Sequence, residues 1–352
     1  MRLIDQYFSR TVISSTATVL FVLLGVFSFF EFIDELEQVG NGEYRLTHVF
    51  VAVLFNLPSL AYELFPIGAL IGSLLALAQL AQSNEIAVVR CAGVPKLRVI
   101  WSVMRAGFVL VVLALVIGEV LVPPAERFVR QYKSDLLASQ RTGAGYWTRD
   151  GENYINVGEI LPNDRLRDVL IYEFDDEQRL RAITKARTAV FDNSEWTLEG
   201  IEQSSFNNGD ILATALPAAK WNSPLKPDLI SLVAQAPEAL SIFELVKYVG
   251  FLEGNGQSSA RYRHALWVKI AYPLAAAVMV FLAIPMVMGQ SSRTTSSGRQ
   301  ILVGGIIGLT FHVANQAAGH VGMVFAIPPA ASALAPAIVL LAVGAVLNWR
   351  SA

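Results

Sequence analysis

The sequence predicts an α-helical membrane protein with six transmembrane helices, three on each side of an inserted β-rich domain. The 352-residue chain has a mean hydropathy of +0.48 and only 16% charged residues. Uncharged stretches of about 20 residues recur along it, the length with which a helix crosses about 30 Å of hydrocarbon. Charge is segregated, because residues 123–264 hold 16 of the 27 Lys and Arg and 20 of the 29 Asp and Glu. We therefore expect membrane segments at 1–122 and 265–352, and a polar domain at 123–264.

The first half of the chain contains three expected membrane helices, at residues 11–33, 48–82 and 99–122. The first follows Arg2 and Arg10 and is longer than the apolar core of a signal peptide, so we expect it to be retained. The second contains a single charged residue, Glu63. It also carries Gly68 and Gly72, whose four-residue spacing favours close contact between helices.

The second half contains a fourth expected helix at 266–288 and two more between residues 301 and 347. That last stretch has no Lys, Arg, Asp or Glu and would measure about 70 Å as one helix. It must therefore cross twice, with a turn at 319–329. Gly304 and Gly308 give the fifth helix a second close-packing face.

The distribution of Lys and Arg predicts the orientation, because cytoplasmic loops are enriched in these residues. With a cytoplasmic N-terminus, the short external loops carry only Arg45. Both termini would then be cytoplasmic and the polar domain would lie outside. The basic residues on the cytoplasmic side would be Arg2, Arg10, Arg90, Lys96, Arg98, Arg293, Arg299 and Arg350.

The polar domain reads as mostly β. Short strand-like runs separated by turn residues indicate a sandwich, jelly roll or barrel. The expected strands are 153–157, 168–174, 181–191, 195–201 and 210–215. A helix at 125–139 is expected to continue from the third membrane helix, and the pattern Ser241-Ile242-Phe243-Glu244 predicts a capping box at the start of another.

The sequence lacks the motifs of common catalytic sites. It contains no phosphate-binding loop, no HExxH and no GxSxG, and its four histidines, at 48, 264, 312 and 320, are widely scattered. The single cysteine, Cys91, excludes an intrachain disulfide, and no basic run suggests nucleic-acid binding. We therefore expect no enzyme, cofactor or metal on this chain, and any energy to be supplied by a partner.

The segment from 83 to 98 is amphipathic and would lie at the cytoplasmic face. Such a helix can dock in a groove of a soluble partner, where Glu85 could pair with an arginine. An ordinary charged loop is an equally open interpretation.

Several other charged residues are candidates for function. Glu63 is the deepest and is expected to be paired or in a cavity, whereas Glu31, Glu119 and Lys269 lie near the outer surface. His312, Asn315 and Gln316 share a helix face and favour interhelical hydrogen bonds. Arg127, Arg130 and Lys133 form a basic stripe that could meet lipid phosphates. A solvated face balanced by Glu126 and Asp135 is the simpler reading of that stripe.

Motifs along the chain resemble the LptF/LptG family of permeases. Residues 80–93, LAQSNEIAVVRCAG, resemble its coupling helix, and 145–151, GYWTRDG, resemble the G-x-W-x-[KR]-D-G start of its periplasmic β-jelly roll. The sequences around Trp267-Val268-Lys269, Pro273-Leu274, Ile327-Pro328-Pro329 and Pro336 resemble its fourth and sixth helices. The start Leu3-Ile4-Asp5-Gln6-Tyr7 is closer to the G-type subunits.

The resemblance implies one permease of a lipopolysaccharide-export ABC transporter in the bacterial inner membrane. Expected partners are an LptF-like permease, a dimeric LptB-like ATPase that binds ATP and Mg, and an LptC-like single-span protein. The helix at about 83–97 would couple to the ATPase through Glu85, Ile86, Val89, Arg90, Ala92 and Gly93. Arg130 and Lys133 match positions proposed to meet lipid A phosphates, and Arg127, Glu63 and Lys269 complete the expected substrate-binding set. Glu31 stands where some relatives have Lys.

Two other functions fit the sequence. The chain could be a membrane-anchored scaffold whose β domain binds an envelope partner without transport. It could also be an independent secondary transporter, which would need a relay of deep ionisable residues where the sequence offers only Glu63.

Overall fold

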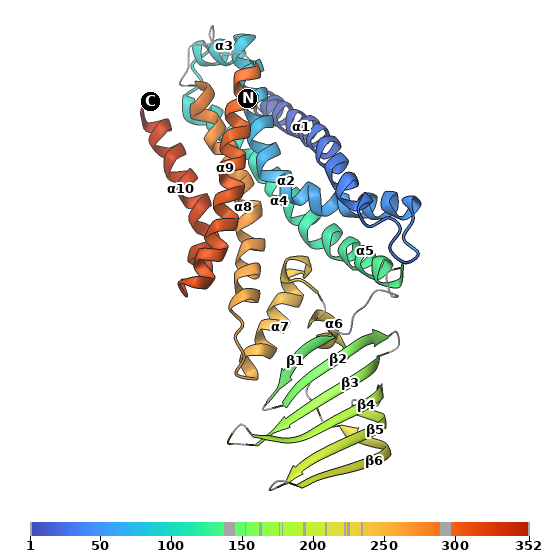
Figure 1. The fold of residues 1–352 in the computed structure, drawn as a ribbon. Helices are drawn as coiled ribbons and strands as arrows, with labels where there is room; N and C mark the ends of the chain where they lie inside the picture. Colours follow the sequence, from blue (N-terminus) through green and yellow to red (C-terminus); the bar gives the residue numbers. More distant parts are fainter. Residues whose placement is uncertain are drawn as a thin grey trace. The chain divides into compact units, whose positions relative to one another are not determined.

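The computed structural model describes residues 2–136, 145–288 and 297–350, apart from short gaps at 152, 162–163, 176, 178, 193–194, 208–209, 222, 224–225 and 234. The chain divides into two compact units (Figure 1). One comprises residues 1–138 and 263–352 and is called the membrane unit. The other comprises residues 139–262 and is called the β unit. The expected loop around Arg293 and several predicted turns lie outside the described residues.

The membrane unit contains the six predicted helices. Six stretches within the described residues are long and apolar enough to cross a membrane: Ile4–Leu36, Leu46–Gln82, Lys96–Lys133, Ala260–Met288, Gly298–Val324 and Pro329–Arg350. They belong to α1 (Arg2–Leu36), α2 (Leu46–Gln82), α4 (Lys96–Val116), α5 (Val122–Leu136), α8 (Ala260–Met288), α9 (Ser297–Val324) and α10 (Pro329–Arg350). The short α3 (Glu85–Cys91) lies between α2 and α4.

The third crossing is not a simple α-helix. A π-helical turn, Ile117–Leu121, separates α4 from α5. A Cβ on Gly118 would lie 2.5 Å from the ring of Tyr62 on α2, so this position accepts only glycine without a shift of that ring. The predicted helix at 125–139 is α5, whose described part ends at Leu136.

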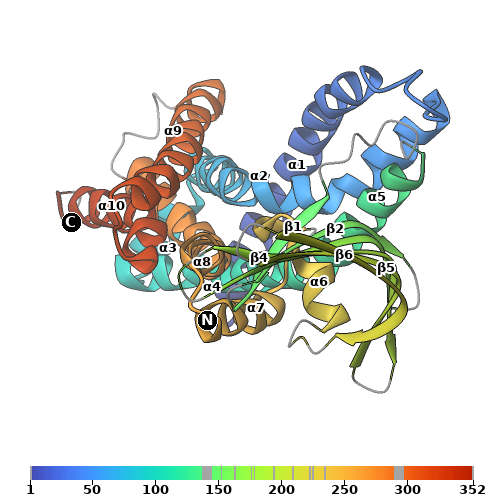
Figure 2. The same cartoon turned by 60° about the horizontal axis from the view of Figure 1, so that its bottom comes forward.

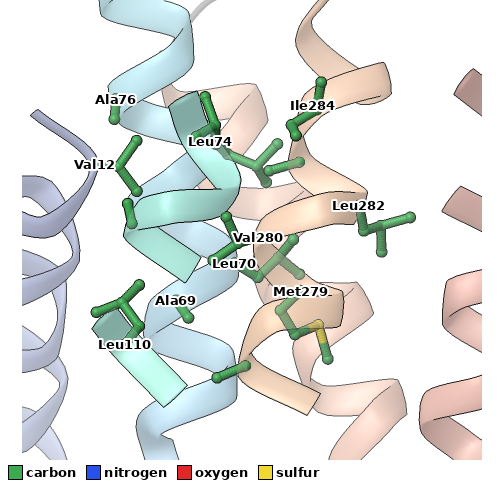
Figure 3. Close-up of a cluster of buried hydrophobic side chains, with 14 of the residues drawn as sticks. Val12, Ala69, Leu70, Leu74, Ala76, Leu110, Met279, Val280, Leu282 and Ile284 are labelled. Carbon is green, nitrogen blue, oxygen red and sulfur yellow. The ribbon is translucent and has the colours of Figure 1, made fainter. Parts of the chain in front are cut away.

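The core of the membrane unit is built on α2. Leu70 and Leu74 of α2 pack with Leu110 of α4 and with Met279 and Val280 of α8 (Figure 3). Such contacts are expected where dispersion and packing, rather than water exclusion, hold helices together in lipid. The second helix is therefore central to this core, and it contacts α1, α4 and α9 directly.

Four glycines bring neighbouring helices close to α2. A Cβ on Gly72 would lie 2.4 Å from Thr16 Cα of α1, and one on Gly68 would lie 2.4 Å from Leu20 Cδ2. On α9, a Cβ on Gly304 or Gly308 would lie 2.9 Å from the side chain of Leu74 or Ile67. Both glycine pairs thus lie at points where two helices touch.

The β unit is a six-stranded antiparallel sheet whose strands pair in sequence order, which fits the predicted jelly-roll-like domain. Its strands are β1 (Tyr146–Asp150), β2 (Asn153–Leu161), β3 (Arg165–Phe174), β4 (Leu180–Asp192), β5 (Glu195–Asn207) and β6 (Asp210–Trp221). The sequence predicted five strands and missed β1. That strand has only five residues, YWTRD, without an apolar alternation, so it carries no strand signal of its own.

The sheet is curved, and α6 (Pro227–Val233) contributes to its core (Figure 2). Trp196, Ile155 and Val169 are buried there together with Ile230 of α6. Asp168 and Gly200 have positive φ angles of 53° and 63° in the middle of β3 and β5, where irregular residues let a sheet bend. The predicted capping box starts α7 (Ile242–Gly254), where Glu244 N–H donates to Ser241 Oγ at 3.3 Å.

Candidate functional site

Two polar regions of the membrane unit contain most of the candidate residues. The first, called the α3 end, comprises α3 and the starts of α1 and α4. The second, called the α5 end, comprises α5, the end of α1 and the start of α2. The two ends of the chain, marked N and C, lie toward the α3 end (Figure 1).

One face of α3 anchors it to the membrane helices. Asn84 adopts a left-handed conformation before it, and Gly93, with φ of +84°, follows it. These two residues let the chain turn sharply on both sides of a seven-residue helix. Ile86 is buried against Phe8 of α1 and Leu80 of α2, and Val89 packs partly against the same cluster.

The opposite face of α3 is exposed. Val88 on this face is 66% exposed. Of the predicted coupling residues, Arg90 is exposed on α3, and Ala92 and Gly93 are exposed just after it. Glu85 accepts hydrogen bonds from Ser83 Oγ at 2.9 Å and Tyr7 Oη at 3.4 Å. Both hydrogen bonds are accepted by Oε1 of Glu85. Among the described residues, none donates a hydrogen bond to its Oε2, which can therefore accept one from another molecule. The α3 surface thus offers an acid, a base and apolar side chains in one short element.

Beside α3, two arginines of α4 share one buried acid of α1. Arg105 Nη1 lies 3.4 Å and Arg98 Nη2 lies 3.7 Å from Asp5 Oδ2, and Ser102 Oγ donates to Asp5 Oδ1 at 2.5 Å. The sequence reasoning missed Arg105 and assigned no role to Asp5. The available signal was a lone charge seven residues after Arg98, inside an otherwise apolar helix.

At the α5 end, the predicted basic stripe is paired with acids. Lys133 Nζ donates to Glu35 Oε2 of α1 at 2.6 Å, and Tyr44 Oη donates to Glu35 Oε1 at 2.5 Å. Burial and the Glu35 carboxylate raise the pKa of Tyr44 above its usual value, which keeps the phenol protonated as a donor. Arg130 lies 3.8 Å from Glu126. Arg127 is exposed on the same helix.

Aromatic rings fasten α5 to the start of α2. The ring centroids of Phe55 and Phe128 are 4.2 Å apart, and Phe128 stacks on Tyr132 at 5.7 Å. Tyr132 in turn meets His48 edge-on at 5.6 Å. The aromatic contacts thus hold α5 against α2, and Lys133 and Arg130 of the stripe face acids of α1 and α5.

The two remaining candidates differ in exposure. Glu63 is about half exposed, and its carboxylate lies 3.6 Å from His312 Nε2 of α9, to which Gln316 is also bonded. Lys269 is buried: its Nζ lies 3.4 Å from Gly118 O and 3.7 Å from Glu119 Oε1, at the π turn. The structure therefore makes Lys269 a cation that joins α8 to the π turn, rather than one that faces open space. Glu31 accepts a bond from Asn56 Nδ2 at 2.8 Å.

Comparison with known proteins matches almost the whole chain. The model of the family described as lipopolysaccharide export system permease LptF/LptG matches residues 6–350. The chain is 32% identical over 342 residues to the lipopolysaccharide export system permease protein LptG of Escherichia coli strain K12, which covers 95% of this chain and 94% of that protein. It is 29% identical over 343 residues to the protein of the same description from Haemophilus influenzae, with 96% of each covered.

Proposed function

Since the chain belongs to the LptF/LptG family of lipopolysaccharide export permeases, we propose that it is one membrane half of an ATP-driven exporter. It takes lipopolysaccharide from the outer leaflet of the bacterial inner membrane and passes it to its periplasmic β unit. Hydrolysis of ATP takes place in a partner, an LptB-like dimer, and an LptF-like permease forms the other half. An LptC-like protein with one span completes the complex.

The observation that carries this proposal is the exposed face of α3 on a buried anchor. Ile86 fixes α3 to the start of α1 and the end of α2, so a force on the exposed face reaches both helices. A helix that presents apolar and charged side chains suits the groove of a soluble partner. Interior packing is dense and transmits displacement, which is how a partner's movement would reach the rest of the membrane unit.

The distribution of basic residues supports an orientation with the α3 end in the cytoplasm. Arg10, Arg90, Lys96, Arg98 and Arg350 all belong to segments at that end. The ATPase would then bind α3 from the cytoplasm. The α5 end would lie at the outer leaflet, which contains the lipopolysaccharide to be exported.

The α5 end supports recognition of phosphate by exchange of partners. Lys133 and Arg130 are held by Glu35 and Glu126, and an incoming lipid phosphate would replace these carboxylates. Phosphates accept several charge-assisted hydrogen bonds from Arg and Lys, so the two cations would keep an anionic partner while Glu35 and Glu126 lose theirs. Lys269 would act indirectly, by holding the π turn from which α5 begins.

Acyl chains need a separate, apolar surface, and α1 offers it. Several of its large side chains are exposed, and a much smaller share of its apolar stretch is buried than in α2. They are Phe21, Phe27, Phe29 and Phe30. An uncovered row of this kind suits contact with lipid tails or with the partner permease.

The test is substitution of Glu85 in the assembled complex. We expect Glu85→Ala to weaken ATPase association about tenfold and to lower lipopolysaccharide-stimulated hydrolysis, because an arginine of the partner would lose its carboxylate. Glu85→Lys should have a larger effect through repulsion. Glu37→Lys, which changes an exposed acid far from α3, is the control. Unchanged association and hydrolysis in both Glu85 variants would contradict the proposal.

A scaffold that binds an envelope partner through its β unit is the second candidate, and β6 favours it. Residues 211–218 of that strand are exposed, and β6 pairs only with β5 among the described strands. An open strand edge is a template for pairing with another chain. A scaffold would keep its function after substitution of Glu85, whereas an exporter would not.

A further inference from the structure

A groove between α1 and the first turns of α4 has a lining of basic and apolar side chains. Its volume is about 510 Å³. Asp5 contributes from α1, and the remaining lining residues come from α4 and the residue before it: Pro95, Leu97, Arg98, Ile100, Trp101 and Arg105. The groove lies beside α3 but does not include the exposed face on which the coupling argument depends.

The charged part of the groove has more donors than its own acid can satisfy. Arg98 and Arg105 converge on Asp5, which is 7% exposed, so these three side chains carry a net charge of +1. Each guanidinium has five N–H donors, whereas Asp5 has two oxygens and one of them accepts the Ser102 hydroxyl. The arginine side chains are 42% and 54% exposed. The cluster is therefore open to a further anionic acceptor.

The apolar part of the groove is also open. Leu97 is 75% and Trp101 64% exposed, and they stand one helical turn apart on α4. Tryptophan is typical of the membrane–water interface, where its ring packs beside lipid and its N–H reaches water. Cations next to an uncovered apolar wall fit an amphiphile better than a small soluble ion.

The position of Arg105 along α4 places this lining at the edge of the hydrocarbon. Residues 106–118 carry no charge and span about 20 Å, less than the full thickness of a bilayer core. Arg105 therefore stands at or inside the headgroup boundary, where an arginine needs a counter-charge. The shared Asp5 supplies only part of it.

We propose that this groove binds an anionic glycerophospholipid of the leaflet at the α3 end. The phosphodiester lies between Arg98 and Arg105, and the glycerol and acyl chains follow Leu97 and Trp101. The site is distinct from the α5 end, where the lipopolysaccharide is expected. Naming this leaflet the inner one relies on the proposed orientation, whereas the binding of lipid does not.

The experiment is native mass spectrometry of the full chain in its purified complex, titrated with phosphatidylglycerol or phosphatidylcholine. We expect phosphatidylglycerol to be retained and phosphatidylcholine to be lost. The Arg98→Gln/Arg105→Gln double variant should bind phosphatidylglycerol at least about tenfold more weakly, since each basic residue near a lipid surface contributes about 1 kcal/mol. Arg299→Gln/Arg350→Gln, which removes two charges outside the groove, should bind as the unmodified chain does.

Asp5→Asn provides a second, opposite test. It keeps an acceptor for Ser102 but removes the acid that competes for the guanidinium groups, so it should strengthen phosphatidylglycerol binding. Equal retention of both lipids, equal loss in the two double variants, or weaker binding in Asp5→Asn would overturn the proposal. Displacement of the lipid by inorganic phosphate alone would also overturn it, because the site would then recognise a free anion. Failure of the Glu85 test would leave these lipid measurements unaffected.

Discussion

The α5 end and the α3 end of the membrane unit differ in how their basic side chains are paired with acids. At the α5 end, Lys133 and Arg130 each face an acid of their own, and Tyr44 donates to the same Glu35 that holds Lys133. At the α3 end, Arg98 and Arg105 share Asp5. At the α5 end the cations Lys133 and Arg130 are thus paired with acids, and our proposal requires a ligand to replace those acids. The α3 end is left with donors and apolar surface for other molecules.

The largest effect is expected from separating α1 and α2, the helices that connect the α3 end to the α5 end. Gly72→Val should destabilise the fold by about 3 kcal/mol or more, because the new side chain would overlap the Thr16 backbone of α1. Gly25→Val on α1, where nothing lies within 4 Å of an added Cβ, is the matched control. Thermal unfolding in detergent measures both. Equal midpoints would mean that α1 and α2 are not in close contact at Gly72.

The next largest expected loss of stability comes from a comparison of two substitutions, one at the α5 end and one at the α3 end. Glu35→Gln leaves the Lys133 ammonium without its acid in a largely buried site and should cost about 2–3 kcal/mol. Asp5→Asn should cost about 1 kcal/mol, since its arginine partners are largely hydrated. Unfolding midpoints of the two variants test the order. A larger loss for Asp5→Asn would reverse our reading of the two networks.

A smaller effect separates the anchored and exposed faces of α3. Ile86→Ala should cost about 2 kcal/mol, because Ile86 is buried against Phe8 and Leu80. Val88→Ser, two residues away and exposed, should change stability by less than about 0.5 kcal/mol. Both should weaken ATPase association, the first through loss of the helix position and the second through loss of contact. Normal association in Val88→Ser would exclude that face from the interface.

The crossings were predictable from the sequence because length and apolarity suffice to define them. The stretch at 48–82, whose single charged residue is Glu63, and the uncharged stretch at 301–347 admit few other structures in lipid. The β unit was predictable as a class but not strand by strand: β1 is too short and polar to be recognised without its pairing to β2.

The side-chain partners were not predictable, because they depend on contacts between distant residues. Lys133 and Glu35 are 98 positions apart, and the contact between Lys269 and Gly118 spans 151. Lys269 was expected near the outer membrane surface as part of the substrate-binding set, and its contacts with Gly118 and Glu119 at the π turn could not be predicted from the sequence. Arg105 was overlooked because the apolar residues around it dominate the pattern of its helix.

The π turn at Ile117–Leu121 sets the direction in which α5 faces. A π turn holds one more residue than an α turn, and each residue advances an α-helix by about 100°. Deleting one residue here would rotate every side chain of α5 by about that angle and swing Lys133 away from Glu35. The direction in which the basic stripe points therefore depends on the one extra residue of the π turn. An insertion or deletion at this point would change that direction and leave the residues of the stripe unchanged.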